Sequence, residues 1–265
     1  LPSVIRYTLP ILATGLLQLL FNTADLIVVG QFCGSNSIAA VGATSSLIQL
    51  MVNLFLGLSV GAGVCVAQGL GAKREREVHC AVHTAILLAL VSGVVLTVIG
   101  FFFLKECLVL MGTPASVLPL STVYIKYYFL GVTGSLVYNF GAAVMRAAGD
   151  TKTPLYYLIV AGVINVVLNV FFVAVLGMNV DGVAIATAIS QTVSAALILY
   201  SLARRTDACR LQLKHLRFHK AQLLKTLQIG VPAGLQSAMF SISNVLIQSS
   251  INSFGETVVA GNSAA

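Results

Sequence analysis

Charged residues are scarce in this chain. Only 9% of its 265 residues are Asp, Glu, Lys or Arg, and 58% are hydrophobic. A soluble globular domain usually has about 25% charged residues. A chain with so few polar groups cannot cover its surface with side chains that water solvates. The composition therefore excludes a soluble domain and predicts an integral membrane protein.

The sequence also lacks the motifs of nucleotide chemistry. It contains neither the GxxxxGK[ST] phosphate-binding loop nor the dinucleotide-binding GxGxxG pattern. The net charge of +7 does not indicate nucleic-acid binding, because the basic residues form no patch interleaved with aromatic residues. We therefore expect no enzyme activity, no nucleic-acid partner and no ATP hydrolysis, so that any transport is driven by an ion gradient.

Metal-ligand spacing is missing as well. The five Cys residues follow no zinc-binding pattern. The pairs His79/His83 and His215/His219 are each four residues apart, which suits one helix face, but neither encloses the Glu of HExxH or has a clear third ligand. We predict no metal site and no cofactor.

Long apolar runs dominate what the chain does contain. Each reaches the length of about 20 residues that a helix needs to cross a bilayer. Helices are expected because backbone groups must be satisfied within the segment in lipid. The sequence predicts an all-α, polytopic membrane helix bundle with spans at Tyr7–Gln31, Ser45–Leu70, Val78–Leu104, Pro119–Met145, Pro154–Leu176, Gly182–Ala203 and Leu227–Ile251.

The basic residues predict how these spans are oriented. Of the 15 Lys and Arg residues, 13 fall before the first span or in alternate loops, and only Lys105 and Lys126 fall on the other side. Lys and Arg concentrate in cytoplasmic loops. We therefore expect a multi-pass protein of the plasma or inner membrane with a cytoplasmic N-terminus.

A basic segment, Arg204–Lys225, follows the first six spans. It predicts a first six-helix lobe over residues 1–203, a cytoplasmic linker over 204–226 and the first helix of a second lobe over 227–265. The spacing of the linker's leucines suits a short helix on the membrane surface. A solvated linker is an equally good interpretation.

The seventh span repeats features of the first. Leu9-Pro10 recurs as Val231-Pro232, 222 residues later, and Phe32-Cys33-Gly34 recurs as Ser253-Phe254-Gly255, 221 residues later. Six spans per unit is an even number, so both units enter the membrane in the same direction. The pattern predicts parallel lobes with a substrate site between them, and we expect the chain to be a fragment that ends early in the second lobe.

Asp25 is the only carboxylate inside a predicted span. Thr14, Gln18, Asn22 and Asp25 are spaced four, four and three residues apart, which places them on one helix face. An ionisable group in a bilayer is costly and usually faces a protein interior or a water-filled cavity. The alternative is a polar helix end, because Asp25 lies near the predicted outer boundary.

Similar polar stripes occur on other spans. Asn165 and Asn169 share a face of the fifth span, and so do Thr187, Gln191 and Ser194 on the sixth and Gln49 and Asn53 on the second. Each pair alone is typical of hydrogen bonding between helices. Together with Asp25 they predict a shared cavity with ion-coupling and cavity residues Asp25, Asn22, Gln18, Asn165, Asn169, Thr187 and Gln191.

Pro10 and two glycines predict how the helices bend and pack. Pro10 lies in the first turns of the first span, where it predicts a kink and a hinge. Gly57 and Gly61 have the GxxxG spacing that predicts close packing of two helices.

Several stretches resemble the multidrug and toxic compound extrusion (MATE) antiporters, in the same order along the whole chain. They are Leu9-Pro10, Asn22-Thr23-Ala24-Asp25, Val29-Gly30, Ala39-Ala40-Val41-Gly42, Val66-Ala67-Gln68-Gly69-Leu70-Gly71-Ala72-Lys73, Met145-Arg146-Ala147-Ala148-Gly149-Asp150-Thr151-Lys152-Thr153-Pro154, Gly182-Val183-Ala184-Ile185-Ala186-Thr187 and Ile229-Gly230-Val231-Pro232.

The resemblance implies twelve helices in two six-helix lobes, and export of organic, often cationic, compounds in exchange for H⁺ or Na⁺. Asp25 and Asn165 match an acidic residue and an asparagine of the family. One branch has an aspartate where this chain has Asn169, and another has a glutamate near Met239 or Phe240, so the coupling ion stays open.

Two alternative functions are also open. A lipid-linked oligosaccharide flippase of the same superfamily should carry basic residues in its cavity, and this lobe has none deep in a span. A seven-helix receptor requires an outside N-terminus, which the charge pattern opposes. The expected partners are small organic molecules and the lipid bilayer, and the full-length protein is expected to be monomeric.

Overall fold

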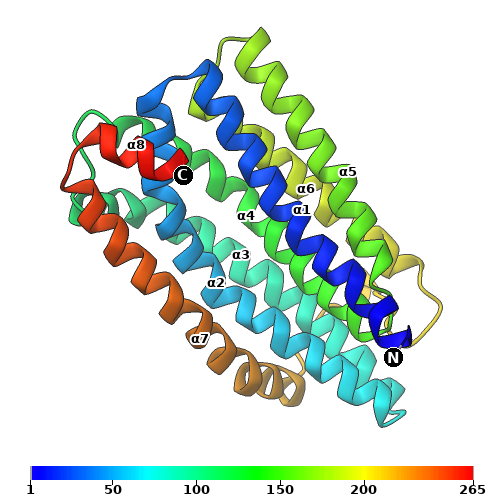
Figure 1. Cartoon of the computed structure of the whole chain (residues 1–265). Helices are drawn as coiled ribbons and strands as arrows, with labels where there is room; N and C mark the ends of the chain where they lie inside the picture. The colour runs from blue at the N-terminus through cyan, green and yellow to red at the C-terminus, as the bar shows by residue number, and fades with distance from the viewer. Residues whose placement is uncertain (1, 265) are drawn as a thin grey trace.

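The computed structural model describes residues 2–264, which fold into a bundle of long helices with no strand (Figure 1). The elements are α1 (Pro2–Phe32), α2 (Ser35–Gly71), α3 (Glu75–Leu110), α4 (Leu118–Ala147), α5 (Lys152–Val170), the π-helical η1 (Phe171–Val175), α6 (Val180–Arg204), the 3₁₀ turn η2 (Leu213–His215), α7 (Lys220–Asn252) and α8 (Glu256–Ala264). The prediction of an all-α bundle is confirmed.

Six of these helices are long and apolar enough to cross a bilayer: α1 to α4, α5 with η1, and α6. The chain is therefore a multi-pass membrane protein. α7 was predicted as a seventh span. It is a helix of 33 residues, but it is not among the candidate spans in the described part of the chain. Gln and Ser residues spread along its length make it less apolar than the other six.

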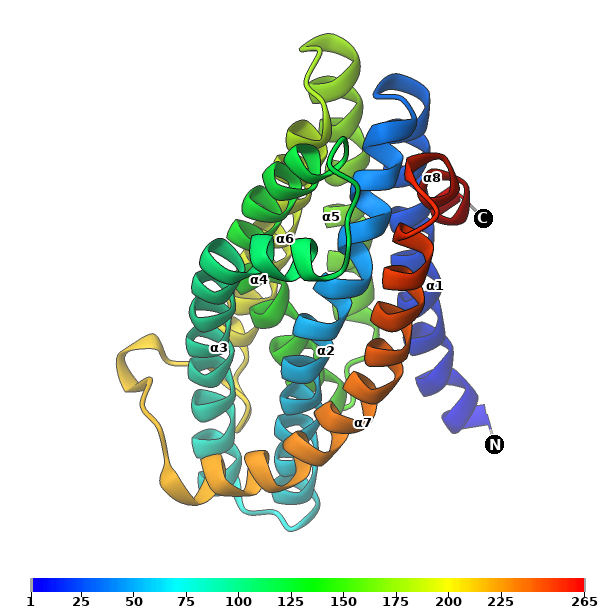
Figure 2. The same cartoon turned by 90° about the vertical axis from the view of Figure 1, so that its left-hand side faces the viewer.

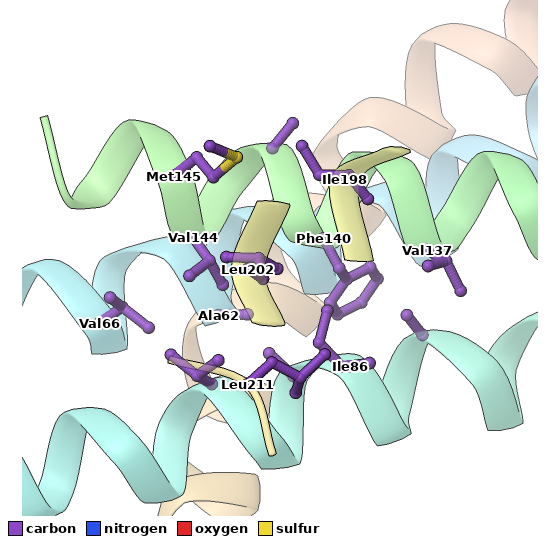
Figure 3. Close-up of a cluster of buried hydrophobic side chains, with 14 of the residues drawn as sticks. Ala62, Val66, Ile86, Val137, Phe140, Val144, Met145, Ile198, Leu202 and Leu211 are labelled. Carbon is purple, nitrogen blue, oxygen red and sulfur yellow. The ribbon is translucent and has the colours of Figure 1, made fainter. Parts of the chain in front are cut away.

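The core of the bundle lies along α4, which packs against α2, α3 and α6. Figure 3 shows Phe140 and Val144 of α4 beside Ile86 of α3 and Ile198 and Leu202 of α6. All five side chains are fully buried. Small residues allow this close packing: a Cβ atom at Gly141 would lie 2.8 Å from the side chain of Ile198.

Helix α2 begins ten residues earlier than the predicted start at Ser45. Gly34 has a φ of 83° and makes the turn between α1 and α2, a conformation that glycine adopts at little cost. The first turns of α2 then bury Ala39 and Ala40 completely. These small residues are only weakly hydrophobic, so the strongly apolar run of the sequence starts after them.

The same turn recurs at the start of the predicted second unit. Gly255 has a φ of 90° and separates α7 from α8, as Gly34 separates α1 from α2. Figure 2 shows α8 turning away from the end of α7. The two glycines occupy matching positions of the sequence repeat, and both allow the change in chain direction.

The segment between α6 and α7 is mostly irregular, and the predicted surface helix over its leucines is wrong. Only the single turn η2 is helical before α7, which begins at Lys220, inside the predicted linker. Leu211 is 2% exposed and lies in the main core, so the linker is not simply solvated either. Arg205 donates to Asp207, and this bond lowers the pKa of the Asp207 carboxyl.

Hydrogen bonds that involve two histidines connect this linker to α3. His83 is fully buried, and its Nε2 accepts a hydrogen bond of 3.0 Å from the backbone N–H of Gln212. Its Nδ1 lies 2.7 Å from the carbonyl oxygen of His79. The backbone N–H of His219 donates to Thr84 Oγ1 at 3.2 Å. The Nδ1 contact lies within α3 and orients the ring, and Nε2 is the nitrogen of His83 that bonds to the linker.

Helices α2 and α7 meet at a glycine seam, defined here as Gly57 and Gly61 of α2 with Gly230 and Gly234 of α7. A Cβ atom at Gly57 would lie 2.1 Å from the backbone nitrogen of Gly234, and one at Gly61 would lie 2.4 Å from the carbonyl oxygen of Thr226. The predicted close packing at the GxxxG spacing is confirmed. Figures 1 and 2 both show α7 alongside α2, and Figure 1 shows α5 on the opposite side of the bundle.

The residues Gly57-Leu58-Ser59-Val60-Gly61 also match the GxSxG pattern of hydrolases. That motif needs a sharp turn between a strand and a helix to expose the serine. Here Ser59 lies in the middle of α2, and its hydroxyl donates to the Leu56 carbonyl oxygen at 2.7 Å. The match therefore reflects helix packing and not a nucleophile.

Candidate functional site

A cavity of about 290 Å³ lies among α1, α4, α5 and α6. Its wall is a mixture of amides, hydroxyls, aromatic rings and one carboxylate. The lining residues are Gln18, Phe21, Asn22, Asp25, Leu56, Tyr128, Ser135, Tyr138, Asn139, Leu158, Ala161, Gly162, Asn165, Thr187, Ser190, Gln191 and Ser194. Six of the seven predicted cavity residues therefore lie on this wall.

Glycine positions α1 against α5 beside this cavity. The ring of Phe21 packs on Gly162, where a Cβ atom would lie 1.9 Å from the ring. A side chain at position 162 would therefore displace the ring of Phe21 from this contact. This contact brings the polar face of α1, which carries Asp25, toward the polar face of α5.

A chain of hydrogen bonds joins Asp25 to α5 and α6. Asn169 Nδ2 donates to Asp25 Oδ1 at 2.5 Å and to Asn165 Oδ1 at 3.2 Å. Asn165 Nδ2 in turn donates to Thr187 Oγ1 at 3.2 Å, and Thr187 donates to the Val183 carbonyl oxygen. Four predicted site residues thus form one connected network.

Asn169 stands behind the cavity wall and not on it. Its side chain is fully buried, and Asn169 Oδ1 accepts no hydrogen bond from any residue that the structure describes. Buried polar atoms normally have a partner, so each exception calls for an explanation. Na⁺ or a hydrogen-bond donor placed beside the Asp25 carboxylate would give Asn169 Oδ1 the partner that it lacks.

Helix α4 supplies cavity residues that the sequence reasoning missed. Tyr128, Ser135, Tyr138 and Asn139 all line the cavity. The last three are spaced three and one residues apart, so they lie close together on one helix face. This spacing was a usable signal, but two of the four residues are tyrosines in an apolar span and did not stand out as polar.

Asn53 forms a hydrogen bond between helices and does not contribute to the cavity. Its Nδ2 donates to Ser241 Oγ of α7 at 3.0 Å, and neither Asn53 nor Gln49 lines the cavity. Thr14 likewise bonds within its own helix, to the Pro10 carbonyl oxygen at 2.8 Å. The Asn53 amide therefore joins two helices and the Thr14 hydroxyl bonds within α1, and neither residue lines the cavity.

Pro10 lies inside α1, four residues before Thr14, and is buried. Proline has no N–H to donate to the carbonyl of the preceding turn, which weakens a helix at that point. The helix continues through it to Phe32. The hinge role of Pro10 stays a prediction.

The sequence model of the MatE family matches residues 10–171, more than half of the chain. The chain belongs to the MatE family. The matched region contains Asp25, Asn165 and Asn169, which are three of the four residues of the hydrogen-bonded network; Thr187 lies beyond it.

Relatives and solved structures of MatE proteins resemble the whole chain. The Probable multidrug resistance protein YoeA of Bacillus subtilis is 31% identical over 98% of this chain and 58% of that protein. The Multidrug export protein MepA of Staphylococcus saprophyticus is 21% identical over 97% of this chain and 57% of that protein. The chain thus spans somewhat more than half the length of these curated relatives.

One solved structure is described as an inward-facing conformation of a multidrug resistance MATE family transporter of the MOP superfamily. Its TM-score is 0.85 at 25% identity, over 99% of this chain and 60% of that one. The fold of the present chain is therefore that of a MATE transporter over nearly all of its length.

Proposed function

We propose that this MatE protein exports organic cations in exchange for H⁺ or Na⁺. One observation carries the proposal: among the described residues that line the cavity, Asp25 is the only one with a charged side chain. A single carboxylate in a low-dielectric site attracts a cation and repels an anion. The names of the relatives, a multidrug resistance protein and a multidrug export protein, support the export of drugs.

The wall around Asp25 suits an organic cation. Phe21, Tyr128 and Tyr138 contribute aromatic rings, whose faces attract cations and offer apolar contact area. The amides and hydroxyls of the remaining wall are adaptable hydrogen-bonding partners. Such a surface recognises charge and shape without demanding one particular molecule.

The exchange follows from competition for one carboxylate. A proton or Na⁺ at Asp25 and Asn169 neutralises the charge that an organic cation needs, so binding of one favours release of the other. Asn169 and Asn165 can keep their hydrogen bonds in either state, because an amide both donates and accepts. Asn165, Thr187 and Gln191 are proposed to orient the site, and Gln18 and Asn22 to contact the substrate.

Efflux of a cationic dye tests this function. Cells without their own exporters should lose preloaded ethidium when they express the protein from its native gene. Collapsing the driving ion gradient should stop the loss, because no ATP-binding motif is present in these residues. Loss of ethidium that survives collapse of both the H⁺ and Na⁺ gradients would rule out ion exchange.

The cavity gives less support to a lipid-linked oligosaccharide flippase. Such substrates carry phosphates, which Arg and Lys side chains recognise. No Lys or Arg is among the residues that line the cavity in the described chain. We therefore prefer cation export to flipping of an anionic lipid.

We further propose that the N-terminus is cytoplasmic, in the plasma membrane. In a background without its five native cysteines, Asn36→Cys should react with an impermeant maleimide added outside intact cells. Lys214→Cys should react only after the cells are opened. Both positions are exposed in the structure, so access depends on the side of the membrane. The reverse pattern of labelling would contradict the orientation.

A further inference from the structure

A second cavity lies at the end of the bundle where α1 starts and α4 ends, which we call the basic end. Its volume is about 330 Å³. The wall comes from the first turns of α1, the second half of α2 and the last turns of α4, and most of it is apolar. The lining residues are Tyr7, Ile11, Ser59, Val60, Gly63, Val64, Ala67, Ala143, Arg146 and Ala147.

Among the described residues of this wall, Arg146 is the one that carries a charge. Within residues 2–264, its guanidinium takes part in none of the ion pairs and donates no hydrogen bond. Asp150, four residues later, is engaged elsewhere, because its Oδ1 accepts from the backbone N–H of Thr153 at 3.0 Å. The cation therefore has no anionic partner in the described chain.

Tyr7 holds α1 against this position without pairing the charge. Its hydroxyl donates to the backbone carbonyl oxygen of Arg146 at 2.8 Å, which leaves the guanidinium nitrogens free. Arg146 is only partly exposed, and an unpaired charge beside an apolar wall is costly. A ligand that brings an anion to this point and covers the apolar wall would relieve that cost.

We propose that this cavity binds an anionic phospholipid, with the headgroup phosphate on Arg146 and an acyl chain along Val60 and Val64. Guanidinium forms two parallel hydrogen bonds with a phosphate. Basic pockets between membrane helices at the bilayer surface are suited to anionic headgroups. Val60 is 53% exposed and lies in the same wall, so it offers the chain an apolar contact. The proposal depends on the membrane location alone and not on the transported substrate.

A tryptophan at Val60 makes the site measurable. The 265 residues contain no Trp, so its fluorescence is read as the difference from the parent protein. The protein expressed from its native gene is reconstituted in phosphatidylcholine vesicles that contain increasing amounts of chain-brominated phosphatidylglycerol or phosphatidylcholine. Val94→Trp is the matched control, because Val94 is 57% exposed on α3 and is not part of the cavity wall.

We expect brominated phosphatidylglycerol to quench the tryptophan of the Val60→Trp variant with about 5-fold preference over phosphatidylcholine, the effect of roughly one basic residue. The control should show about equal quenching by the two lipids. Arg146→Gln should remove the preference, and Arg146→Lys should keep part of it because the charge remains. Soluble glycerol phosphate should not compete, because it cannot cover the apolar wall.

Three results would overturn the proposal. Equal quenching of the Val60→Trp variant by both lipids would mean that no phosphate is held there, as when a carboxylate elsewhere in the protein pairs with Arg146. A preference that survives Arg146→Gln would place the phosphate on another residue. Competition by glycerol phosphate would assign the site to a soluble anion. If Arg146→Gln does not fold, the lipid preference of the Val60→Trp variant, compared with that of the Val94→Trp variant, still tests whether the cavity selects the anionic lipid.

Discussion

Asp25→Asn should abolish ion-coupled efflux of ethidium and leave the amount of protein in the membrane nearly unchanged. Asparagine has the same size and can still accept the hydrogen bond from Asn169 Nδ2, so the contacts of α1 with α5 persist. It carries no charge and takes up no proton. Removing one partner of a buried charge pair costs roughly 2–5 kcal/mol, so cation binding should weaken by about 30-fold or more.

Glu106→Gln is the matched control, because it also replaces a carboxylate by its amide. Glu106 is exposed near the end of α3 and is not among the residues that line the cavity. Its efflux should equal that of the parent protein at equal abundance. If Asp25→Asn exports as well as this control under the same gradient, Asp25 is structural and the coupling site lies elsewhere.

The location of the membrane helices was predictable because a bilayer demands about 20 apolar residues in one run. Their ends were less predictable. The first turns of α2 consist of small residues such as Ala39 and Ala40, which are buried by packing and not by hydropathy. The start of α7 was hidden because its first turns carry polar residues that resemble a linker.

The candidate site was predictable where the polar residues differ clearly from their surroundings. Asp25, Asn165 and Thr187 stand out in apolar spans, and the structure joins them in one network. Spacing alone could not separate them from Asn53, which bonds to α7. That distinction depends on which helix faces which, and the packing partners are set by glycines far apart in the sequence.

Gly57→Ala should destabilise the protein strongly, because the glycine seam leaves no room for a methyl group. The new Cβ would lie 2.1 Å from the backbone nitrogen and 2.2 Å from the Cα atom of Gly234. Neither atom belongs to a flexible side chain, so α2 and α7 must move apart. Overpacking of this kind costs roughly 1–3 kcal/mol, which should lower the unfolding temperature in detergent by several degrees.

Gly15→Ala is the control for the intrinsic effect of the substitution. Gly15 lies in α1, and a Cβ atom there would meet nothing within 4 Å. Alanine should stabilise that helix slightly, because glycine loses more backbone freedom on folding. An unfolding temperature for Gly57→Ala as high as that of Gly15→Ala would show that the two helices do not touch in the membrane protein.

Combining Gly57→Ala with Gly234→Ala tests whether both glycines belong to one contact. A Cβ atom at Gly234 would lie 2.3 Å from the carbonyl oxygen of Leu54, on the same stretch of α2. The first substitution already separates the helices, so the second should add less than its effect alone. Fully additive losses would mean that the two glycines act independently, and the seam would not be a single packing unit.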